Sequence, residues 1–310
     1  MLPKLKDIKI NSLRELSLRL GIELKVLQDV AEYINIHYEK FSKKMGEKVR
    51  MLYEADHSLE EIHRQIEKRI LNRFDYPLSL QGGIKGRSRL TNAMPHVKKL
   101  NVGHFDIKSF FPSVRPSHVY CTFHKLGGAP DVAHLLTRLV TADNHLPQGF
   151  KTSTKVAALV LLDADRRLSH FLKKYGVVHN IWVDNLTVSG SYPIKKLVSG
   201  IRRILRQEGF ESHKEKFVYS HERQAVLGVV VNVKPNVPKD MRKEVDGIVY
   251  KCEKFGVRSY LKVTKQNMRI KQFLRHVNGK LSSMLAVDKE KYRPLYERWQ
   301  KVIASSGVKV

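Results

Sequence analysis

The chain has 310 residues, 42% of them hydrophobic, and its 57 Lys and Arg against 30 Asp and Glu give a net charge of +27. This composition argues against a disordered chain and predicts a folded protein with one large core or two to three subdomains. So large a cationic excess favours a polyanionic partner. Nucleic acid is the partner we expect, although a ribosome-associated or membrane-surface role also fits the charge.

The cysteine content and the apolar runs indicate in which cellular compartment the protein is expected. Cys121 and Cys252 are too few for a disulfide framework or a four-ligand zinc site, so reduced thiols are expected. The N-terminus, MLPKLKDIKINSL, lacks the continuous apolar core of a signal peptide. The longest apolar run, residues 156–162, is too short to span a bilayer. We therefore expect a soluble, cytoplasmic protein with no membrane partner.

The first part of the chain predicts helices around one basic hairpin. Residues 1–40 place apolar side chains at helical spacing and form a helical N-terminal segment. Residues 37–52, HYEKFSKKMGEKVRML, predict a hairpin that turns at Met45 and Gly46, with its basic part over residues 43–50. This basic hairpin is either solvated or in contact with a triphosphate. A further helix is expected over residues 58–71, opened by a capping signature of Ser58 and Glu61.

Residues 80–99, LQGGIKGRSRLTNAMPHVKK, predict a glycine-rich loop. Glycines allow a backbone to approach a phosphate or sugar closely, and the loop adds cations such as Lys85 and Arg87. A generic surface loop is the alternative interpretation.

Residues 101–114, NVGHFDIKSFFPSV, are a short apolar run around a single carboxylate, Asp106. The run is closed by Pro112 and Ser113, so we expect a buried strand whose end lies at a cleft. A carboxylate in apolar surroundings must be met by a cation or by strong donors. Asp106 is therefore a candidate metal ligand, and a hydrogen bond to a neighbouring loop is the alternative.

The middle of the chain continues with helices, then a turn. Residues 117–141 are expected to be helical. Residues 146–154, LPQGFKTST, predict a turn and a helix start where a base or phosphate can rest on free amides. The side chains expected to cap this helix are Thr152, Ser153 and Thr154.

Residues 177–190, VVHNIWVDNLTVSG, have two apolar arms around a polar pair, which predicts a hairpin with Asp184 and Asn185 in its turn. If this turn lies beside the end of the first strand, Asp106 and Asp184 come together. Two adjacent carboxylates repel each other unless a hard cation such as Mg²⁺ lies between them. A pair of metal ions there would serve an in-line phosphoryl displacement.

The remaining chain predicts a helix, two strands and a basic tail. The helix is expected over residues 194–208, and the strands over residues 217–219 and 225–233. Residues 239–303 predict a helical and basic C-terminal region.

In this order the segments resemble a reverse transcriptase, and within that family the bacterial retron type, over about residues 36–300. HFDIKSFFPSV resembles the first palm motif, which implies a metal ligand in Asp106 and a steric gate against ribonucleotides in Phe111. LPQGFKTST resembles the segment that contacts the incoming nucleotide and the template, here through Gln148 and Gly149. WVDNLTVSG stands where the family has Tyr-x-Asp-Asp, which makes Asp184, also a metal ligand, and Asn185 catalytic positions.

The resemblance extends to the flanking segments. GFESHKEKF resembles the segment that carries a lysine general acid, best matched by Lys216. The basic hairpin resembles the fingers, with Arg50 as the triphosphate contact. RQAVLGVVVN fits the turn that grips the primer, at Leu227 and Gly228. Lys85 and Arg87 are expected to contact nucleic acid.

Two features resemble retrons in particular. Asn92-Ala93-x-x-His96 matches a motif that retron enzymes carry just before the first palm strand, and it implies nucleic-acid contacts by Asn92 and His96. RQAVLGVVVN resembles the retron Val-Thr-Gly segment, with Leu227 in place of Thr. The implied fold is α+β: a right-hand polymerase with an antiparallel palm sheet flanked by helices. Its expected parts are an N-terminal helical segment (1–40), fingers and palm (41–234) and a small helical thumb (235–310).

Two departures from the family pattern bear on mechanism. Trp182 replaces the family's Tyr, and Asn185 replaces its second Asp. Loss of one carboxylate should weaken metal affinity, so we expect an active enzyme with two Mg²⁺ ions and a greater response to Mn²⁺. A catalytically weakened RNA-binding scaffold is the opposing interpretation.

The resemblance implies an RNA-directed DNA polymerase that copies part of a cognate structured non-coding RNA into single-stranded DNA. Priming from a 2′-hydroxyl would give a branched RNA–DNA product (msDNA), and the system would serve anti-phage defence. The implied partners are the non-coding RNA, its cDNA, dNTPs and an effector protein. A defence-associated reverse transcriptase outside the retrons is the alternative within the same enzyme class.

Overall fold

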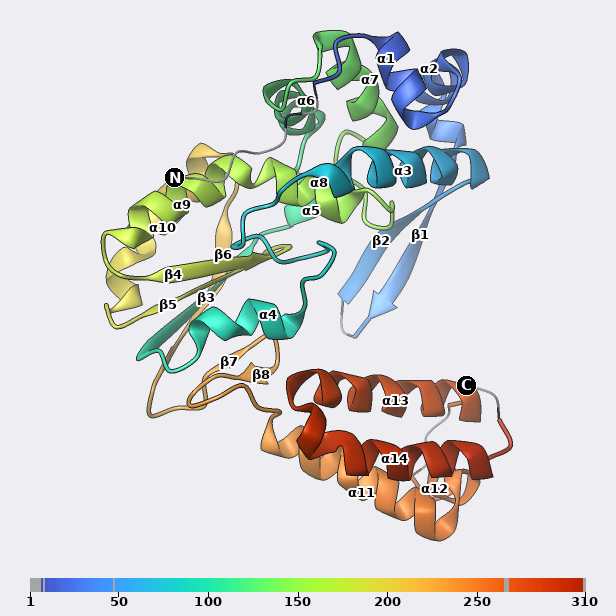
Figure 1. Cartoon of the computed structure of the whole chain (residues 1–310), viewed down its shortest axis with the longest axis vertical. Coiled ribbons are helices and arrows are strands. Elements are labelled where there is room, and N and C mark those ends of the chain that lie inside the picture. Colours follow the sequence, from blue (N-terminus) through green and yellow to red (C-terminus); the bar gives the residue numbers. More distant parts are fainter. Residues whose placement is uncertain (1–6, 8, 47, 265–267, 309–310) are drawn as a thin grey trace. The chain divides into compact units, whose positions relative to one another are not determined.

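The computed structural model describes residues 7, 9–46, 48–264 and 268–308, in which helices flank short antiparallel strands (Figure 1). The chain divides into two compact units. Unit 1 comprises Met1–Ser88 and Asn101–Phe217, and unit 2 comprises Arg89–Leu100 and Val218–Val310. The expected α+β class with an antiparallel sheet is confirmed. The three-part division with boundaries at residues 40 and 234 differs from these units and stays a prediction.

The N-terminal part of unit 1 is helical, as predicted. It contains α1 (Leu13–Leu20), α2 (Leu24–Glu32) and the 3₁₀ turn η1 (Ile34–Ile36). Ser12 starts α1, because its hydroxyl accepts the N–H of Glu15 and satisfies a free helix donor. Residues 1–6 and 8, which the same prediction covered, lie outside the described residues.

The basic hairpin is confirmed, and its second strand runs three residues beyond the predicted stretch. Strands β1 (Tyr38–Met45) and β2 (Lys48–Ala55) pair along their whole length, and Lys43 lies opposite Arg50. The turn includes Gly46, whose φ of 64° favours glycine, as expected.

The next helix, α3 (His57–Arg69), begins one residue earlier than predicted and is followed by η2 (Leu71–Arg73). Its cap is Asp56 and not Ser58. The Asp56 carboxylate accepts the Leu59 N–H at 2.8 Å and also contacts His37 Nδ1 at 2.8 Å. The predicted capping box was therefore wrong, because a better acceptor precedes it.

The central sheet has four strands in the order β4-β5-β3-β6. Its members are β3 (Asn101–Ile107), β4 (Val178–Trp182), β5 (Asn185–Gly190) and β6 (Ser212–Tyr219). β5 pairs antiparallel with both β4 and β3. Residues 186–190 of β5 are all buried, which places this strand in the interior of unit 1.

Helices pack around this sheet and share one hydrophobic core with it, which includes Phe105, Leu186 and Leu168. They are α5 (Phe110–Ser113), α6 (Pro116–Lys125), α7 (Pro130–Val140), α8 (Ser153–Val160), α9 (Leu162–Lys173), η4 (Ile194–Leu197) and α10 (Val198–Gln207). The helical stretch predicted over residues 117–141 is two helices, because the chain turns at Gly127, where φ is 92°.

Unit 2 has its own core, which includes Trp299, Phe273 and Val249. Its elements are α4 (Arg89–Ala93), η3 (Met94–His96), β7 (Ala225–Val226), β8 (Val229–Val230), α11 (Lys239–Phe255), α12 (Val257–Val263), α13 (Ile270–Val287) and α14 (Lys289–Ser305). The helical C-terminal prediction is confirmed for the described residues. In the described part of the chain, no helix combines the length and apolarity needed to cross a membrane.

Two local predictions in unit 2 were wrong. Residues 89–96 are short helices and not a loop. Residues 225–233 are not one strand, because the chain reverses at Leu227 and Gly228, both with positive φ (48° and 80°). Positive φ at both turn residues is typical of the tight hairpin turn that matches strand twist.

Candidate active site

The structure brings Asp106 and Asp184 to the same place. Asp106 lies near the end of β3 and pairs directly with Asn185, the first residue of β5. The N–H of Ile107 donates to the carbonyl oxygen of Asp184 at 2.8 Å. The β4–β5 turn is therefore Val183 and Asp184, and Asn185 lies just after it rather than within it.

The electrostatics around Asp184 favour a cation. Burial raises the pKa of its carboxyl group, and the negative charge of Asp106 raises it further. The Asn185 amide, which donates to Asp184 Oδ1 at 2.9 Å, and the charge of Arg50 act in the opposite direction. The net shift of this pKa is upward, mainly because of burial and in part because Asp106 repels the charged form, and a bound cation would offset both effects.

The two carboxylates suit a hard divalent ion whose other ligands are water and the oxygens of a bound phosphate. Both carboxylates are partly exposed, so water and phosphate oxygens can reach them. Among the described residues, no group of three or more His, Cys, Asp or Glu gathers as a closed metal cage. Mg²⁺ is commonly bound through one or two carboxylates plus substrate phosphates and water, and the two aspartates fit that mode.

The turn that carries Asp184 is held from outside the hairpin. Val183 has a φ of 58°, an unusual conformation for a β-branched residue. The segment before Gly82 runs beside β4, with Ile181 N–H donating to Ser79 and Gln81 N–H donating to Ile181. A Cβ on Gly82 would lie only 2.5 Å from the Val183 nitrogen. This close approach to the turn explains why residue 82 is a glycine. The sequence analysis had instead connected the glycines of this loop with the approach of a phosphate or sugar.

Arg87 organises the same loop from within. Its guanidinium, partly buried, donates to the carbonyl oxygens of Tyr76, Pro77 and Leu80. These bonds use three of its five N–H donors, and its expected contact with nucleic acid stays a prediction. Lys85, in contrast, is exposed.

Arg50 lies on β2 and is exposed, and its charge acts on Asp184. The hairpin that carries it is fixed by Asp143, a residue that the sequence did not single out. The Asp143 carboxylate accepts from the hydroxyls of Tyr38 and Tyr53, each at 2.9 Å, and from Lys40 Nζ at 3.0 Å. Three side chains from both strands thus converge on one acceptor.

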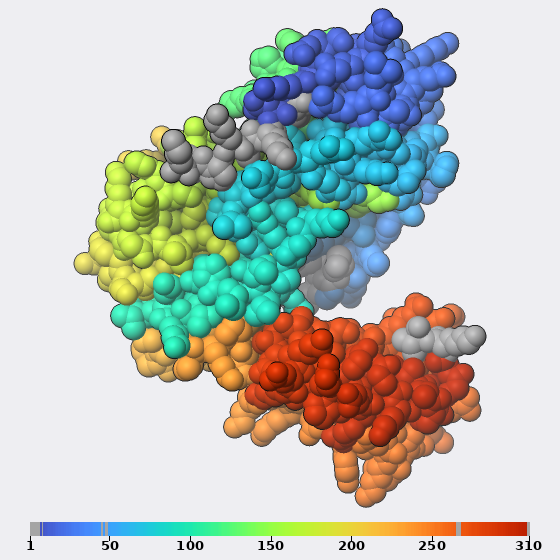
Figure 2. Space-filling view, in the orientation of Figure 1, coloured from blue at the N-terminus to red at the C-terminus, as the bar shows by residue number. Residues whose placement is uncertain are grey.

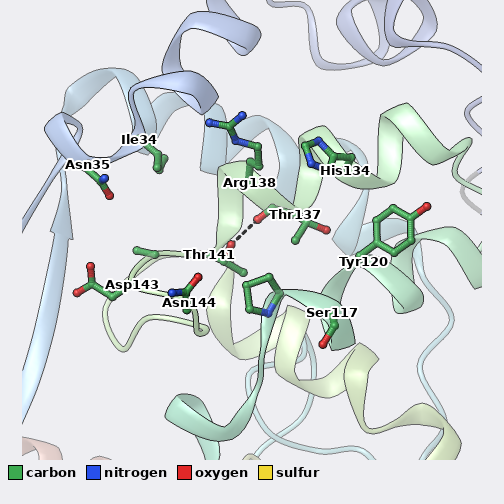
Figure 3. A pocket seen from close by; sticks show the side chains of 12 residues that line it. Ile34, Asn35, Ser117, Tyr120, His134, Thr137, Arg138, Thr141, Asp143 and Asn144 are labelled. Carbon is green, nitrogen blue, oxygen red and sulfur yellow. Dashed lines mark hydrogen bonds between the residues drawn. The ribbon is translucent and has the colours of Figure 1, made fainter.

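The pKa values of these groups reflect that convergence. Burial raises the pKa of Tyr38 and of Tyr53 to about 12, and the hydrogen bonds and charge of Asp143 contribute. Burial would raise the pKa of Asp143, but the bonds from Lys40, Tyr53 and Tyr38 outweigh it and lower that pKa. Asp143 also borders a cavity of about 610 Å³ between η1, α6 and α7 (Figure 3). None of the predicted site residues lines this cavity.

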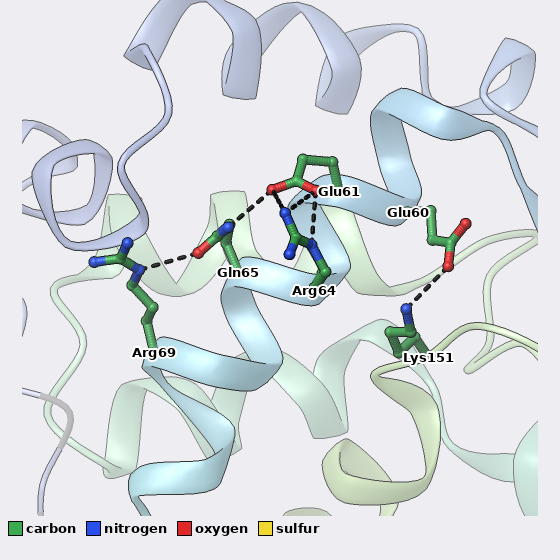
Figure 4. Close-up of polar contacts among 6 residues, drawn as sticks. All are labelled: Glu60, Glu61, Arg64, Gln65, Arg69 and Lys151. Carbon is green, nitrogen blue, oxygen red and sulfur yellow. Dashed lines mark hydrogen bonds and ion pairs between the residues drawn. The ribbon is translucent and has the colours of Figure 1, made fainter.

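The segment around Gln148 and Gly149 is joined to the hairpin by backbone contacts. Tyr53 N–H donates to the Gln148 carbonyl oxygen at 2.8 Å. Gly149 has a φ of 127°, and a Cβ there would collide with the Tyr53 carbonyl oxygen. Next to it, Lys151 Nζ pairs with Glu60 of α3 at 2.9 Å (Figure 4).

The predicted side-chain capping of α8 was wrong. Thr152 lies at the cap position in helical conformation, and its side chain makes no capping hydrogen bond.

Phe111 follows β3 in α5 and is partly buried. Its ring centroid lies 5.8 Å from that of Phe110, which is itself 5.5 Å from the ring of Phe210. The buried Phe110 therefore anchors this short helix, and Phe111 keeps part of its surface accessible.

Two residues of β6 bear on the site. Lys216 is exposed, and its charge, after burial, contributes to lowering the pKa of His104 to about 4. His213 was not predicted, and its Nε2 lies 3.6 Å from Asp106 Oδ2. The signal available was its place in the same GFESHKEKF segment as Lys216.

The predicted contacts in unit 2 fall in two kinds of environment. Asn92 and His96 are 1% and 0% exposed, so their side chains pack inside the unit. Leu227 and Gly228 form the tip of the β7–β8 hairpin, where Gly228 is exposed. Direct nucleic-acid contact by Asn92 and His96 stays a prediction.

Comparison with known proteins places the chain in a family. No family model matches it. It is 30% identical over 278 residues to the retron Se72 reverse transcriptase of Salmonella heidelberg, covering 85% of this chain and 73% of that protein. It is 27% identical to the retron Ec86 reverse transcriptase of Escherichia coli, covering 92% and 88%. The retron Mx65 reverse transcriptase of Myxococcus xanthus is 29% identical, covering 69% and 56%.

Among solved structures, telomerase from Candida albicans in complex with a telomeric RNA fragment aligns with a TM-score of 0.48 and 10% identity. The alignment covers 87% of this chain and 63% of that one.

The antiparallel sheet brings two aspartates together, and the charge of Arg50 on the basic hairpin acts on one of them. This is the arrangement that the sequence resemblance implied for a template-directed nucleotidyltransferase. The sequence relationship makes the class specific: the chain belongs to the retron reverse transcriptases. It is an RNA-directed DNA polymerase, and it depends on a divalent metal and an RNA template.

Proposed function

We propose that this enzyme copies part of a cognate structured non-coding RNA into single-stranded DNA, starting from a 2′-hydroxyl of that RNA. The product would be a branched RNA–DNA molecule, and the system would act in anti-phage defence, together with an effector protein. Membership of the retron family supports this proposal. The single observation that carries the chemistry is the meeting of Asp106 and Asp184 at the ends of paired strands.

In this proposal Asp106 and Asp184 would hold two Mg²⁺ ions. Such ions lower the pKa of the attacking hydroxyl and stabilise the leaving pyrophosphate. Arg50 binds the triphosphate of the incoming dNTP, consistent with its exposure and its effect on Asp184. Lys216 donates a proton to the leaving pyrophosphate, for which its exposed position on β6 is suited.

Selection of the substrate falls to residues next to these. Phe111 would exclude the 2′-hydroxyl of a ribonucleotide, and the packing of its partly exposed ring against Phe110 supports this role. Gln148 and Gly149 would contact the nucleotide and the template, and the bond from Tyr53 couples their position to the hairpin of Arg50. In unit 2, the Leu227–Gly228 turn would contact the primer, and α11–α14 would act as the thumb.

Asn185 makes a specific prediction about metal use. Restoring a carboxylate with Asn185→Asp adds a third negative charge beside Asp106 and Asp184. We expect the Mg²⁺ concentration for half-maximal extension to fall on the order of tenfold, and the preference for Mn²⁺ to decrease. Titration of both metals in primer extension would measure this. An unchanged metal response would argue that Asn185 lies outside the metal site.

The product itself tests the proposal. The protein would be purified from cells that carry its native flanking DNA, and the bound nucleic acid treated with RNase and with a 2′–5′ debranching enzyme. A short single-stranded DNA that is released by debranching, and that is absent from an Asp184→Ala variant but present in an Asp29→Ala control, is the expected result. DNA without a branch would move the assignment to another defence-associated reverse transcriptase. RNA with no DNA would contradict the proposed reaction.

A further inference from the structure

The β4–β5 hairpin has a second end, away from Asp184, where three aromatic side chains meet. Phe171 lies in α9, Tyr175 follows that helix, and Tyr192 follows β5. The ring centroids of Phe171 and Tyr175 are 5.5 Å apart, and those of Tyr175 and Tyr192 are 4.7 Å apart. Tyr175 is 37% exposed, so this aromatic cluster reaches the solvent.

The strand register separates this cluster from the candidate active site. Val178 pairs with Ser189 at the aromatic end of the hairpin, and Trp182 pairs with Asn185 at the end next to Asp184. The strand between them rises about 3.3 Å per residue, which gives roughly 13 Å from end to end. A ligand on Tyr175 therefore lies at the opposite end of the hairpin from Asp184.

A cationic groove continues from the aromatic cluster. It lies between α9 and α10, has a volume of about 750 Å³, and includes Phe171 in its lining. Figure 2 shows residues of α9, in yellow-green, at the surface of unit 1. Among the described residues that line the groove, none is acidic, and the cations are Arg166, Arg167, Lys173, Lys174 and Arg203.

Among the described residues, three of these five cations have no acidic partner. Arg166 pairs with Asp163 at 3.1 Å, and Arg167 pairs with Glu208. Lys173, Lys174 and Arg203 are exposed, and within the part of the chain that the structure describes no carboxylate pairs with them. Their mutual repulsion is relieved only by counterions or by an anionic ligand.

The aromatic wall of the groove is closely packed against α10. The Phe171 ring lies against Gly200 of α10, where a Cβ would collide with it. This close approach holds α9 and α10 together and fixes the ring on which Tyr175 packs. A fixed aromatic surface beside unpaired cations suits a ligand that has both flat apolar faces and negative charges.

We propose that this aromatic–basic surface (Phe171, Lys173, Lys174, Tyr175, Tyr192 and Arg203) binds RNA at an unpaired stretch. The cations hold phosphates, and the exposed face of Tyr175 stacks on a base. Stacking on aromatic side chains combined with a positively charged groove is the general mode of single-strand binding. The inference rests on the proposed function only in that the latter supplies a structured RNA as the partner.

The test compares two charge-matched variants of the full-length protein. The groove variant is Lys173→Ala, Lys174→Ala, Arg203→Ala. The control variant is Arg14→Ala, Lys25→Ala, Lys68→Ala, which removes three exposed cations from α1, α2 and α3. The probe is a fluorescein-labelled RNA hairpin with an unpaired adenosine tail, beside the same hairpin without the tail. Binding is measured by anisotropy over a range of salt concentrations.

For the groove variant, we expect the slope of log affinity against log salt to become shallower by about 2, as for three lost phosphate contacts on a single strand. The control variant should keep the wild-type slope. Tyr175→Ala should weaken binding of the tailed hairpin on the order of tenfold and leave the untailed hairpin unchanged, and Tyr175→Phe should restore binding.

Primer extension on a poly(rA)–oligo(dT) substrate is measured in parallel, so that the two proposals fail separately. If the wild type does not extend the primer, the polymerase function is contradicted. The RNA surface would still be supported in that case, provided that the binding differences between the variants are observed. Equal slopes for the groove and control variants would overturn the RNA surface. Binding of a polyglutamate peptide that only the groove variant loses, with RNA binding intact, would overturn it in favour of an acidic protein partner.

Discussion

The two ends of the β4–β5 hairpin carry opposite charge and are held in place by different kinds of contact. At the turn, Asp184 faces Asp106, and the backbone is held by β3 and by the loop at Gly82. At the open end, Tyr175 and Tyr192 lie beside a groove whose lining is cationic. The first end depends on backbone contacts, and the second depends on side chains from α9, from α10 and from the segments that follow α9 and β5.

This difference follows from what each kind of chemistry requires. Transfer of a nucleotidyl group needs reacting atoms fixed within a fraction of an ångström, so its carboxylates belong on buried, hydrogen-bonded backbone. Binding of a flexible polyanion tolerates movement, so exposed lysines and a stacking ring suffice. The predictions below separate the two ends, beginning with the largest expected effect.

Asp184→Asn should abolish primer extension, which depends on the turn, and should leave RNA binding at the open end intact. The substitution removes one of the two carboxylates that meet there, and we expect primer extension to fall on the order of 10³-fold. Binding of the tailed RNA hairpin should not change. Asp29→Asn, an exposed position on α2 with the same change in charge, is the control for both measurements. Extension that survives in Asp184→Asn would exclude the proposed metal role.

Gly82→Ala tests the support of the turn without changing any charge. The new Cβ would meet the Val183 nitrogen at 2.5 Å, so the turn must shift. A displacement of about 1 Å can lower a catalysed rate on the order of 10²-fold. The matched substitution is Gly247→Ala, because a Cβ there meets no atom within 4 Å. Equal extension rates for the two variants would show that the turn accommodates the methyl group.

Asp143→Asn tests whether positioning of the hairpin carries over to Arg50. The amide loses the ion pair to Lys40 and is a weaker acceptor for Tyr38 and Tyr53. A loss of about 1 kcal/mol corresponds to about a fivefold change. We expect KM for dNTP to rise by that factor while kcat changes little, with Asp29→Asn as the control. A fall in kcat at constant KM would place the effect elsewhere.

The last prediction concerns His63, which lies at neither end of the hairpin. Its titration should change the stability of unit 1 as a whole and so affect both ends alike. His63 is fully buried in α3, and its Nε2–H donates to the Leu139 carbonyl oxygen at 2.8 Å. Burial lowers its pKa to about 4, while Glu60 and Lys151 act on it in opposite directions.

The folded state therefore keeps His63 neutral at a pH where the unfolded chain is already protonated. Stability should be full above pH ~6.5 and should decrease by about 3 kcal/mol as the pH falls toward 4. Urea unfolding at pH 7.5 and pH 5 would measure the slope, which His63→Gln should reduce. A variant with the wild-type slope would assign the pH dependence to other groups.

The sequence predicted the elements that depend on local patterns. Short apolar runs indicated a strand around Asp106 and a hairpin around Asp184, and the structure pairs these three strands in one sheet. The basic hairpin and the C-terminal helices follow from the same periodicity. These features need only neighbouring residues to be specified.

What the sequence did not reveal depends on distant contacts. Asp143 binds side chains about a hundred positions away, and Gly82 fits against a turn at Val183, so neither has a local signature. At the start of α3, Asp56 rather than Ser58 makes the cap because His37 also holds its carboxylate. The apolar run of residues 225–233 predicted one strand because leucine seldom adopts positive φ, and only the family resemblance indicated a turn at Leu227 and Gly228.

The discontinuous make-up of unit 2 has a consequence for synthesis of the protein. Arg89–Leu100 leaves the ribosome before β3, yet the rest of its unit begins only at Val218. At about 5–20 residues per second, this segment waits roughly 6–24 s for its partners. During that interval, buried positions such as Asn92, Ala93 and His96 lack β7 and β8, with which α4 packs in the folded unit. The nascent chain should therefore bind chaperones most strongly while residues 101–217 are being made.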